Sequence, residues 1–350
     1  MEARYTPVLL PLLRTARKIA IASHVNPDGD AVAAVLALSM SLRLARWDAQ
    51  AISPSPVPAI YRFLPEWESV AVYSAEESEN SGGATRAAEM LLGAEVIVCV
   101  DCSDLARLGA LYERYPRKFE TTPIVNIDHH ASNTGFGRLN VVDSSAAAVC
   151  EQLAVLMEQE DLPITADVAN VLLVGIVSDT LGLRSPATSA RTLRVAADLM
   201  ERGASISKIS ERIFNTRSPR ALKLWGSVLS RTHVENGLVW ADITSEMLDE
   251  CGARLEDADT LVDFIAGVPG TSAAFLFSEQ GGKVRVSMRT SGRLDAASLA
   301  RAFGGGGHPR AAGCTVEGSM AEVQALLLGE AARRLGLVAT GLEGQQKAVS

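Results

Sequence analysis

Residues 18–31 read Lys-Ile-Ala-Ile-Ala-Ser-His-Val-Asn-Pro-Asp-Gly-Asp-Ala, and the architecture of the first half of the chain can be inferred from them. The run from Lys18 to Ala22 is short and apolar, which is typical of a buried strand. Pro27 and Gly29 interrupt the apolar pattern as turn residues do. An Ala- and Leu-rich segment from Ala31 to about Ala45 then has the composition of a helix. A strand, a polar loop and a helix are therefore predicted in direct succession.

The same succession returns further along the chain. Apolar runs predict strands at Glu95–Val100 and Pro123–Ile127, and helix patterns follow near Ser145–Glu158 and Thr165–Ser178. Strands that alternate with helices favour an α/β fold in which a parallel sheet is covered on both faces. Ligands of such sheets gather at the carboxyl ends of the strands, so polar residues at these positions are candidates for a site.

The second half of the chain has a different pattern. Residues 190–218 are predicted to form a helical connection, because Leu193, Ala196, Ala197 and Met200 recur at helical spacing. The strands and the closing helix predicted after it are Leu238–Ile243, Ala273–Phe277, Lys283–Arg289 and Ala321–Leu335.

These patterns divide the chain into four parts. We expect a catalytic, metal-binding domain over residues 1–190 and a helical linker over residues 191–221. A smaller α/β domain that binds substrate is expected over residues 222–340, followed by a frayed tail over residues 341–350. The active site is expected in the cleft between the two domains.

Composition excludes several classes of protein. The chain has 350 residues, of which 41 are acidic and 33 basic, and the net charge of -8 disfavours proteins that track long nucleic acids. Its five cysteines are odd in number and follow no pattern, which indicates a reducing compartment. No apolar run approaches the roughly 20 residues of a membrane span. We therefore expect a cytoplasmic protein that does not interact with membranes.

The loop after the first strand concentrates groups that bind metal ions. His24, Asp28 and Asp30 lie within seven residues, and such groups repel one another or stay poorly paired unless a cation joins them. The alternative is a solvated acidic turn in which Asp30 caps the following helix.

Similar groups follow the other predicted elements. Asp128, His129 and His130 come directly after an apolar strand, where two adjacent histidines have no packing role. Asp101 also ends a strand, and Asp179 ends an apolar helix, where a negative charge opposes the helix dipole. A surface loop, a turn residue and a simple helix end are the respective alternatives.

If the loops converge, the ligands number four Asp and two His, and four carboxylates balance the charge of two divalent cations. Mixed imidazole and carboxylate ligands suit Mn²⁺, with Mg²⁺, Co²⁺ and Zn²⁺ as competitors. Two cations about 3.5–4 Å apart can clamp a phosphoryl group and generate a hydroxide near neutral pH. The six expected metal ligands are His24, Asp28, Asp30, Asp101, His129 and Asp179.

A second motif lies in the smaller domain. Gly304, Gly305, Gly306 and Gly307 precede His308, and consecutive glycines let backbone N–H groups approach a phosphate closely. Arg289 on its strand can lie nearby, so it and His308 are predicted to bind phosphate or base. A flexible turn is the alternative for a run of glycines.

Together these motifs resemble those of the DHH phosphoesterases that carry a C-terminal DHHA1 domain, and most of all the nano-RNase/pAp-phosphatase branch. The motifs, in the order of that family, are His24-Val-Asn-Pro-Asp-Gly-Asp30, Val100-Asp-Cys-Ser-Asp104, Asp128-His-His130, Ser178-Asp-Thr180 and Gly304-Gly-Gly-Gly-His-Pro-Arg-Ala-Ala-Gly313. The resemblance covers about residues 10–340. One departure is the run Leu181-Gly-Leu-Arg184, where the family often has Gly and an aromatic residue, and it bears on substrate preference.

The resemblance implies a role for each residue of the site. His24, Asp28 and Asp101 would hold one metal ion, while Asp30, Asp101, His129 and Asp179 would hold the other, with Asp101 as the bridge. His130 would face the scissile phosphate, and Asp128 would orient a histidine. Arg107 would help to line the cleft, and the glycine run with Arg289 and His308 would bind substrate.

The implied activity is Mn²⁺-dependent hydrolysis of short RNA or DNA oligonucleotides to mononucleotides, and of pAp or pApA. One alternative is a RecJ-like exonuclease that acts on longer single strands. Such an enzyme would need a basic channel and aromatic side chains on which bases stack. A DHH-type pyrophosphatase and a non-catalytic nucleotide sensor are further alternatives. The Ala-rich surface helices are compatible with a homodimer.

Overall fold

The computed structural model describes residue 13 and residues 16–73, 85–215 and 218–337. The chain forms two compact units, Met1–Thr216 and Arg217–Ser350, which we call the first and the second unit. The expected tail at 341–350 and the residues Thr216 and Arg217 lie outside the described residues. Among the described helices, none is both long and apolar enough to cross a membrane.

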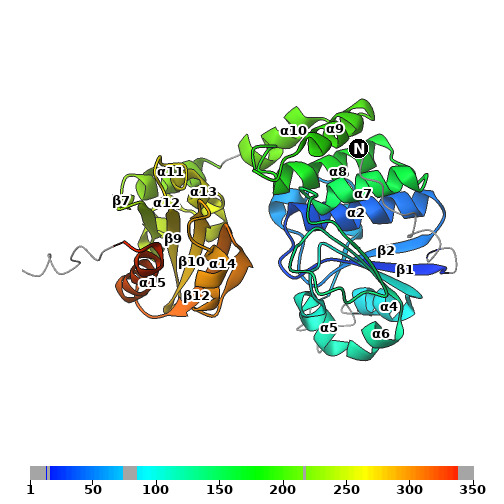
Figure 1. Cartoon of the computed structure of the whole chain (residues 1–350), viewed down its shortest axis with the longest axis horizontal. Helices are drawn as coiled ribbons and strands as arrows, with labels where there is room; N and C mark the ends of the chain where they lie inside the picture. Colours follow the sequence, from blue (N-terminus) through cyan, green and yellow to red (C-terminus); the bar gives the residue numbers. More distant parts are fainter. Residues whose placement is uncertain (1–12, 14–15, 74–84, 216–217, 338–350) are drawn as a thin grey trace, which may run out of the picture. The chain divides into compact units, whose positions relative to one another are not determined.

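The first unit is built on a six-stranded sheet in which every neighbouring pair of strands is parallel. Its strand order is β3-β2-β1-β4-β5-β6, and Figure 1 labels two of its neighbouring strands, β1 and β2. The strands are β1 (Lys18–Ala22), β2 (Asp48–Ser53), β3 (Ala71–Val72), β4 (Val96–Val100), β5 (Ile124–Asp128) and β6 (Leu139–Val142).

Helices cover both faces of this sheet, because its central strands are apolar on both sides. Ile19 and Ile21 of β1 pack in one core, while Ala20 and Ala22 pack in the other. The first core contains α2 (Gly29–Leu44), α7 (Val149–Gln159), α8 (Ala166–Asp179) and α9 (Ala190–Glu201), and the second contains α4 (Thr85–Gly93), α5 (Ala110–Arg114) and α6 (Pro116–Thr121).

The strand order places the polar loops together. The connections from β1 and from β4 lead to opposite halves of the sheet, and ligands of open parallel sheets bind where the order reverses in this way. The loop after β1 carries His24 and Asp28, and Asp101 follows β4 directly. These two motifs therefore lie at the position where this topology leaves a crevice.

The second unit has its own six-stranded sheet, of order β11-β12-β10-β9-β8-β7, in which β8 and β9 are parallel and the other pairs antiparallel. Two cores lie on its faces. Its strands are β7 (His233–Glu235), β8 (Leu238–Ile243), β9 (Ala273–Gln280), β10 (Lys283–Thr290), β11 (Gly306–His308) and β12 (Ala311–Glu317). Its helices are α11 (Pro219–Leu229), α12 (Ser245–Cys251), α13 (Leu261–Ile265), α14 (Ala296–Arg301) and α15 (Met320–Leu335).

The α/β class and the strongly patterned elements are confirmed, but the prediction of which face of one helix is buried is wrong. In α9 the buried residues are Thr192, Val195, Ala196 and Leu199, whereas Leu193 and Met200 of the predicted apolar stripe are exposed. Ser189 caps α9, and the described part of the predicted helical connection also contains the short helix α10 (Ile206–Ser210) and the π-helix Glu211–Asn215.

Three helices meet closely at Gly175 of α8. A Cβ atom at this position would lie 2.3 Å from the sulfur of Cys150 on α7 and 2.6 Å from Oδ1 of Asp30 on α2. Helix packing beside the predicted metal site thus depends on the absence of a side chain here.

We expect Gly175→Ala to lower the thermal unfolding midpoint, because overpacking a rigid core costs about 1–3 kcal/mol. The matched control is Gly226→Ala in α11, where no atom lies within 4 Å of an added Cβ. The control should stabilise the protein by about 0.5–1 kcal/mol, because alanine favours a helix over glycine. Differential scanning calorimetry measures the unfolding midpoint of each variant. Equal midpoints for the two variants would contradict the packing argument.

Candidate metal centre

Asp101 occupies the middle of the site and has an unusual backbone. Its φ of 54° lies in the left-handed region, which is uncommon for residues other than glycine. Its side chain is buried, with the whole residue only 2% exposed. Non-glycine residues held in this conformation cluster at functional sites, where the surrounding structure enforces them.

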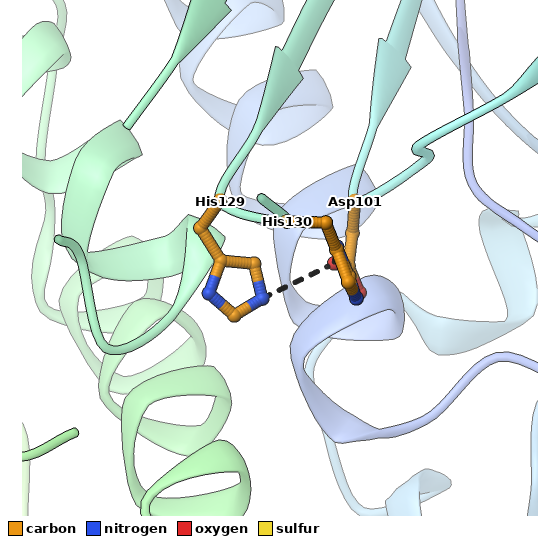
Figure 2. Close-up of side chains that lie close together, drawn as sticks. All are labelled: Asp101, His129 and His130. Atoms are coloured by element: carbon orange, nitrogen blue, oxygen red, sulfur yellow. Dashed lines mark ion pairs between the residues drawn. The ribbon is translucent and has the colours of Figure 1, made fainter. Parts of the chain in front are cut away.

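Three histidines face the carboxylate of Asp101. His24 Nε2 lies 3.5 Å from Oδ2, while His129 Nε2 and His130 Nδ1 lie 3.6 and 3.5 Å from Oδ1. Figure 2 shows His129 and His130 side by side after β5, both directed toward Asp101. Within the described residues Asp101 Oδ1 is buried without a hydrogen-bond partner, which is an unfavourable state for a carboxylate oxygen unless a cation is bound.

Backbone carbonyls orient two of these rings. His24 Nδ1 lies 2.7 Å from the carbonyl oxygen of Val25, and His129 Nδ1 lies 3.3 Å from that of Ala146. Each contact leaves Nε2 directed at Asp101. Metal-binding histidines in proteins commonly donate their other ring nitrogen to such an acceptor.

The loop after β1 and the start of α2 supply two more carboxylates. Asp28 caps α2, since its Oδ1 accepts hydrogen bonds from the amides of Asp30 and Ala31. The alternative in which Asp30 is the cap is therefore wrong. Asp30 instead accepts hydrogen bonds from the amides of Val149 and Cys150, at 2.5 and 3.0 Å, at the beginning of α7.

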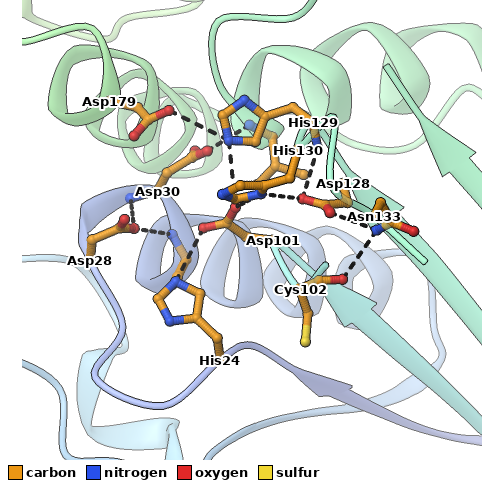
Figure 3. Close-up of polar contacts among 12 residues, drawn as sticks. His24, Asp28, Asp30, Asp101, Cys102, Asp128, His129, His130, Asn133 and Asp179 are labelled. Atoms are coloured by element: carbon orange, nitrogen blue, oxygen red, sulfur yellow. Dashed lines mark hydrogen bonds and ion pairs between the residues drawn. The ribbon is translucent and has the colours of Figure 1, made fainter. Parts of the chain in front are cut away.

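Among the described residues, three sets of side chains have ligand atoms within 4.8 Å of one another. The first is His24, Asp28 and Asp101, the second is Asp30, His129 and Asp179, and the third is Asp101, His129 and His130. Figure 3 shows them converging from β1, β4, β5, α2 and α8. All six expected ligands are thus brought together, although Asp101 is not part of the second set and His130 joins the third.

Electrostatics also favour a cation. Burial, together with the charge of Asp101, raises the pKa of Asp30 to about 7. Burial alone would lower the pKa of His129, but its close contact with the Asp101 carboxylate and the charges of Asp30 and Asp179 raise it to about 10. Burial opposes ionisation of Asp101, yet its contacts with His129 and His24 hold its pKa well below the usual range. In the absence of metal, protons therefore supply positive charge that divalent cations could replace.

The sequence did not single out Asn133 and Asn126, which support the histidine pair. Asn133 Nδ2 donates to Asp128 Oδ2 at 2.6 Å and to Asn126 Oδ1 at 2.7 Å. Asp128 Oδ1 in turn lies 2.7 Å from His130 Nδ1. A polar Asn126 within an otherwise apolar strand was the available signal for this network.

Arg107 and the residues of the second unit occupy distinct places. The carbonyl of Arg107 accepts a hydrogen bond of 2.8 Å from the amide of Val25, which places Arg107 beside the His24 loop. In the second unit, Arg289 and Gly304–Gly307 line a cavity of about 710 Å³ together with Arg285 and Ser287. His308 is exposed and is not among the residues that line this cavity.

Only part of the glycine run lies outside regular secondary structure, so the flexible turn given as the alternative does not describe all of it. Gly306–His308 form the edge strand β11, which pairs with β12. A Cβ at Gly305 would lie 2.1 Å from the carbonyl oxygen of Gly313, so the close approach of β12 requires this glycine. An added Cβ at Gly306 meets no atom within 4 Å, so packing does not explain that glycine.

Arg289 is also less free than the sequence implied. Its Nε lies 2.5 Å from Asp263 Oδ1, and Nη2 lies 3.3 Å from Oδ2. A guanidinium has five N–H groups, so Arg289 keeps donors for a ligand while it is paired.

Comparison with known proteins places these motifs in a family context. Residues 18–176 match the N-terminal domain of the DHH family, and residues 243–335 match the DHHA1 domain. The bifunctional oligoribonuclease and PAP phosphatase NrnA of Thermus thermophilus is 33% identical over 301 residues, which cover 86% of this chain and 84% of that protein. NrnA of Bacillus subtilis is 29% identical over 298 residues, or 84% of this chain and 87% of that protein.

A solved structure agrees with the fold. The crystal structure of an exopolyphosphatase-related protein from Bacteroides fragilis superposes with a TM-score of 0.84, and the match covers 94% of both chains at 23% identity.

We expect the affinity for a divalent cation to rise at least about tenfold from about pH 7 to about pH 8, because binding displaces the proton of His129 and any proton that Asp30 keeps near its pKa of about 7. The pKa of His129 is raised from 6.5 to about 10 in the metal-free fold. The stability that its proton contributes is therefore complete below about pH 6.5 and lost as the pH rises through about 10. Calorimetric titration with Mn²⁺ measures the slope, and His233→Gln in the second unit is the control that should keep it. An affinity independent of pH would contradict the assignment of His129 as a ligand.

Proposed function

Because the chain belongs to the DHH family of phosphoesterases and carries a DHHA1 domain, we propose that it hydrolyses short oligonucleotides to mononucleotides and dephosphorylates pAp. The names of its relatives from Thermus thermophilus and Bacillus subtilis describe these two activities. The observation that carries the proposal is the convergence of five potential ligands on the buried Asp101, which is the sixth and has an unusual backbone conformation.

The donor set fits a pair of divalent cations. His24, Asp28 and Asp101 would hold one ion, and Asp30, His129 and Asp179 would hold the other, with Asp101 adjacent to both sets through His24 and His129. Mixed nitrogen and oxygen donors favour Mn²⁺ over the harder Mg²⁺, with Co²⁺ as a further alternative. Bound cations would supply Lewis acidity toward a phosphoryl oxygen and a hydroxide nucleophile near neutral pH.

The remaining residues of the centre would orient one another and the substrate, and His130 would act on the scissile phosphate. His130 is held by Asp128, which Asn133 holds in turn, so its ring has a fixed direction. Burial would raise the pKa of Asp128, but hydrogen bonds from His130 and Asn133 lower it, so the carboxylate stays ionised. We propose that His130 faces the scissile phosphate and stabilises charge there or assists the leaving oxygen. Arg107 would add a positive charge on the side of His24.

The cavity of the second unit would hold the nucleotide. Its volume of about 710 Å³ lies within the range of small-molecule sites, and Arg285, Ser287 and Arg289 of β10 contribute polar groups from one face of the strand. We propose that Arg289 contacts a phosphate and that the backbone of Gly306 approaches the ligand, with His308 at the edge. The net charge of -8 and the 5% aromatic content support short substrates over long strands.

A cleft between the two domains, the expected domain boundaries, a cytoplasmic location and a homodimer stay predictions. The RecJ-like exonuclease and the nucleotide sensor are retained as outcomes of the experiment below.

Purified protein with Mn²⁺ should rapidly hydrolyse an RNA dinucleotide, a pentanucleotide and pAp, should attack a strand several times longer slowly, and should leave pyrophosphate intact. Asp101→Ala should abolish hydrolysis, because Asp101 contacts both sets of ligands. Product analysis of labelled substrates measures each rate. Faster attack on the long strand would indicate an exonuclease, and nucleotide binding without any hydrolysis would indicate a sensor.

Arg289→Met should raise the KM for pAp about tenfold with little change in kcat, because a charge-assisted hydrogen bond to phosphate contributes about 1.5 kcal/mol or more. Lys283→Met is the control on the same strand, since Lys283 is exposed and pairs with Glu317 at 3.1 Å. Steady-state kinetics on both variants decide the matter, and an equal effect of the two changes would argue against a specific contact at Arg289.

A further inference from the structure

The segment of residues 143–150, which we call the 143–150 loop, connects β6 to the start of α7 and contacts two of the expected ligands. Its Ala146 carbonyl is the partner of His129 Nδ1, at 3.3 Å. Its last two amides, those of Val149 and Cys150, bind both carboxylate oxygens of Asp30. The loop therefore sets the direction of His129 and of Asp30, which belong to the same set of ligands.

Arg191 of α9 anchors both ends of this loop. Its Nη1 lies 2.8 Å from Oδ2 of Asp143, the first residue of the loop, and its Nε donates to Oε1 of Glu151, which follows the last. The backbone amide of Asp143 also donates to the carbonyl of Asp128, at 3.0 Å, next to the histidine pair. One guanidinium thus fixes the separation of Asp143 and Glu151 through two directed contacts, which the planar fork of arginine allows.

Glu151 is a buried carboxylate that needs Arg191 as its partner. The residue is 0% exposed, and its other oxygen accepts hydrogen bonds from Thr192 Oγ1 at 2.7 Å and from the amide of Ala147 at 3.2 Å. A buried carboxylate is tolerated when it is paired, and removal of its partner is strongly destabilising locally. Loss of Arg191 would therefore loosen the loop at Ala147, next to the carbonyl that orients His129.

The effect should be confined to one set of ligands. His24 is oriented by the carbonyl of Val25, and Asp28 by the first amides of α2, and neither contact involves the 143–150 loop. We infer that Arg191 is a positioning residue for the cation held by Asp30, His129 and Asp179, and that it acts through the 143–150 loop. This inference rests on the cation site of the proposed function.

Direct titration with Mn²⁺ in two backgrounds tests the inference. His24→Ala weakens one set and leaves Asp30, His129 and Asp179, whereas Asp179→Ala does the reverse. Adding Arg191→Met should lower the Mn²⁺ affinity about 10- to 100-fold in the His24→Ala background, as the loss of groups that orient ligands typically does. In the Asp179→Ala background the affinity should change less than about twofold.

Arg202→Met is the matched control. Arg202 caps the C-terminal end of α9 and is exposed. It pairs with Glu158 of α7 at 2.8 Å, so it links the same two helices as Arg191, at a position away from the 143–150 loop. Its change should leave the affinity within about twofold in both backgrounds. Equal weakening by the two variants, or equal weakening in the two backgrounds, would mean that Arg191 only supports helix packing.

A second substitution covers a failure of Arg191→Met to fold, which circular dichroism would reveal. Arg191→Lys keeps the charge but cannot reproduce both directed contacts, so a smaller loss with the same selectivity is expected. No selectivity in either variant overturns the inference. A wild-type chain that binds no Mn²⁺ overturns it together with the proposed function, whereas selective binding without hydrolysis overturns the proposed function alone and leaves the role of Arg191 supported.

Discussion

The crowding of carboxylates around Asp101 is the constraint that the rest of the first unit accommodates. Asp28, Asp30, Asp101 and Asp179 lie close together, where like charges repel one another. Asp30 and Asp101 are also buried, which disfavours their ionised forms, whereas Asp28 and Asp179 are open to solvent in part. The fold offers partial compensation. Helix N-termini bind Asp28 and Asp30, and three histidines surround Asp101. None of these contacts gives Asp101 Oδ1 a hydrogen bond, so the arrangement is complete only with added positive charge.

The parallel sheet brings these carboxylates together with short connections. β1, β4 and β5 are adjacent strands whose carboxyl ends meet at one edge, so ligands far apart in the chain arrive together without long loops. α8 supplies Asp179 as its last residue, and the close contact at Gly175 places α8 against Asp30. The contact at Gly175 thus packs α8 against α2 and α7 and also places Asp179 near Asp30. A larger residue at position 175 would disturb both, which explains why a glycine is needed there.

The sequence predicted the parts of this structure that rest on local signals. Apolar strands that end in Asp101 or Asp128 combine two local patterns, and the topology rule for parallel sheets brings them together. Contacts between distant residues were missed, because no local pattern connects Arg191 to Asp143 or Asn133 to Asn126. The strands β2 and β11 lack apolar runs, and β6 has only four residues. α9 carries two apolar stripes, and tertiary packing determines which of them is buried. The glycine run was assigned to ligand binding as a whole, although Gly305 serves the pairing of β11 with β12.

The ion pair between Arg289 and Asp263 gives the cavity of the second unit a resident counter-ion. If this cavity holds the nucleotide, as proposed, a phosphate would share the Arg289 guanidinium with Asp263, because the pair leaves other N–H donors for a ligand. The carboxylate would reduce the net positive charge that attracts the phosphate, and it would keep Arg289 paired after the phosphate departs. An internal counter-ion of this kind would favour the release of a nucleotide product over its retention.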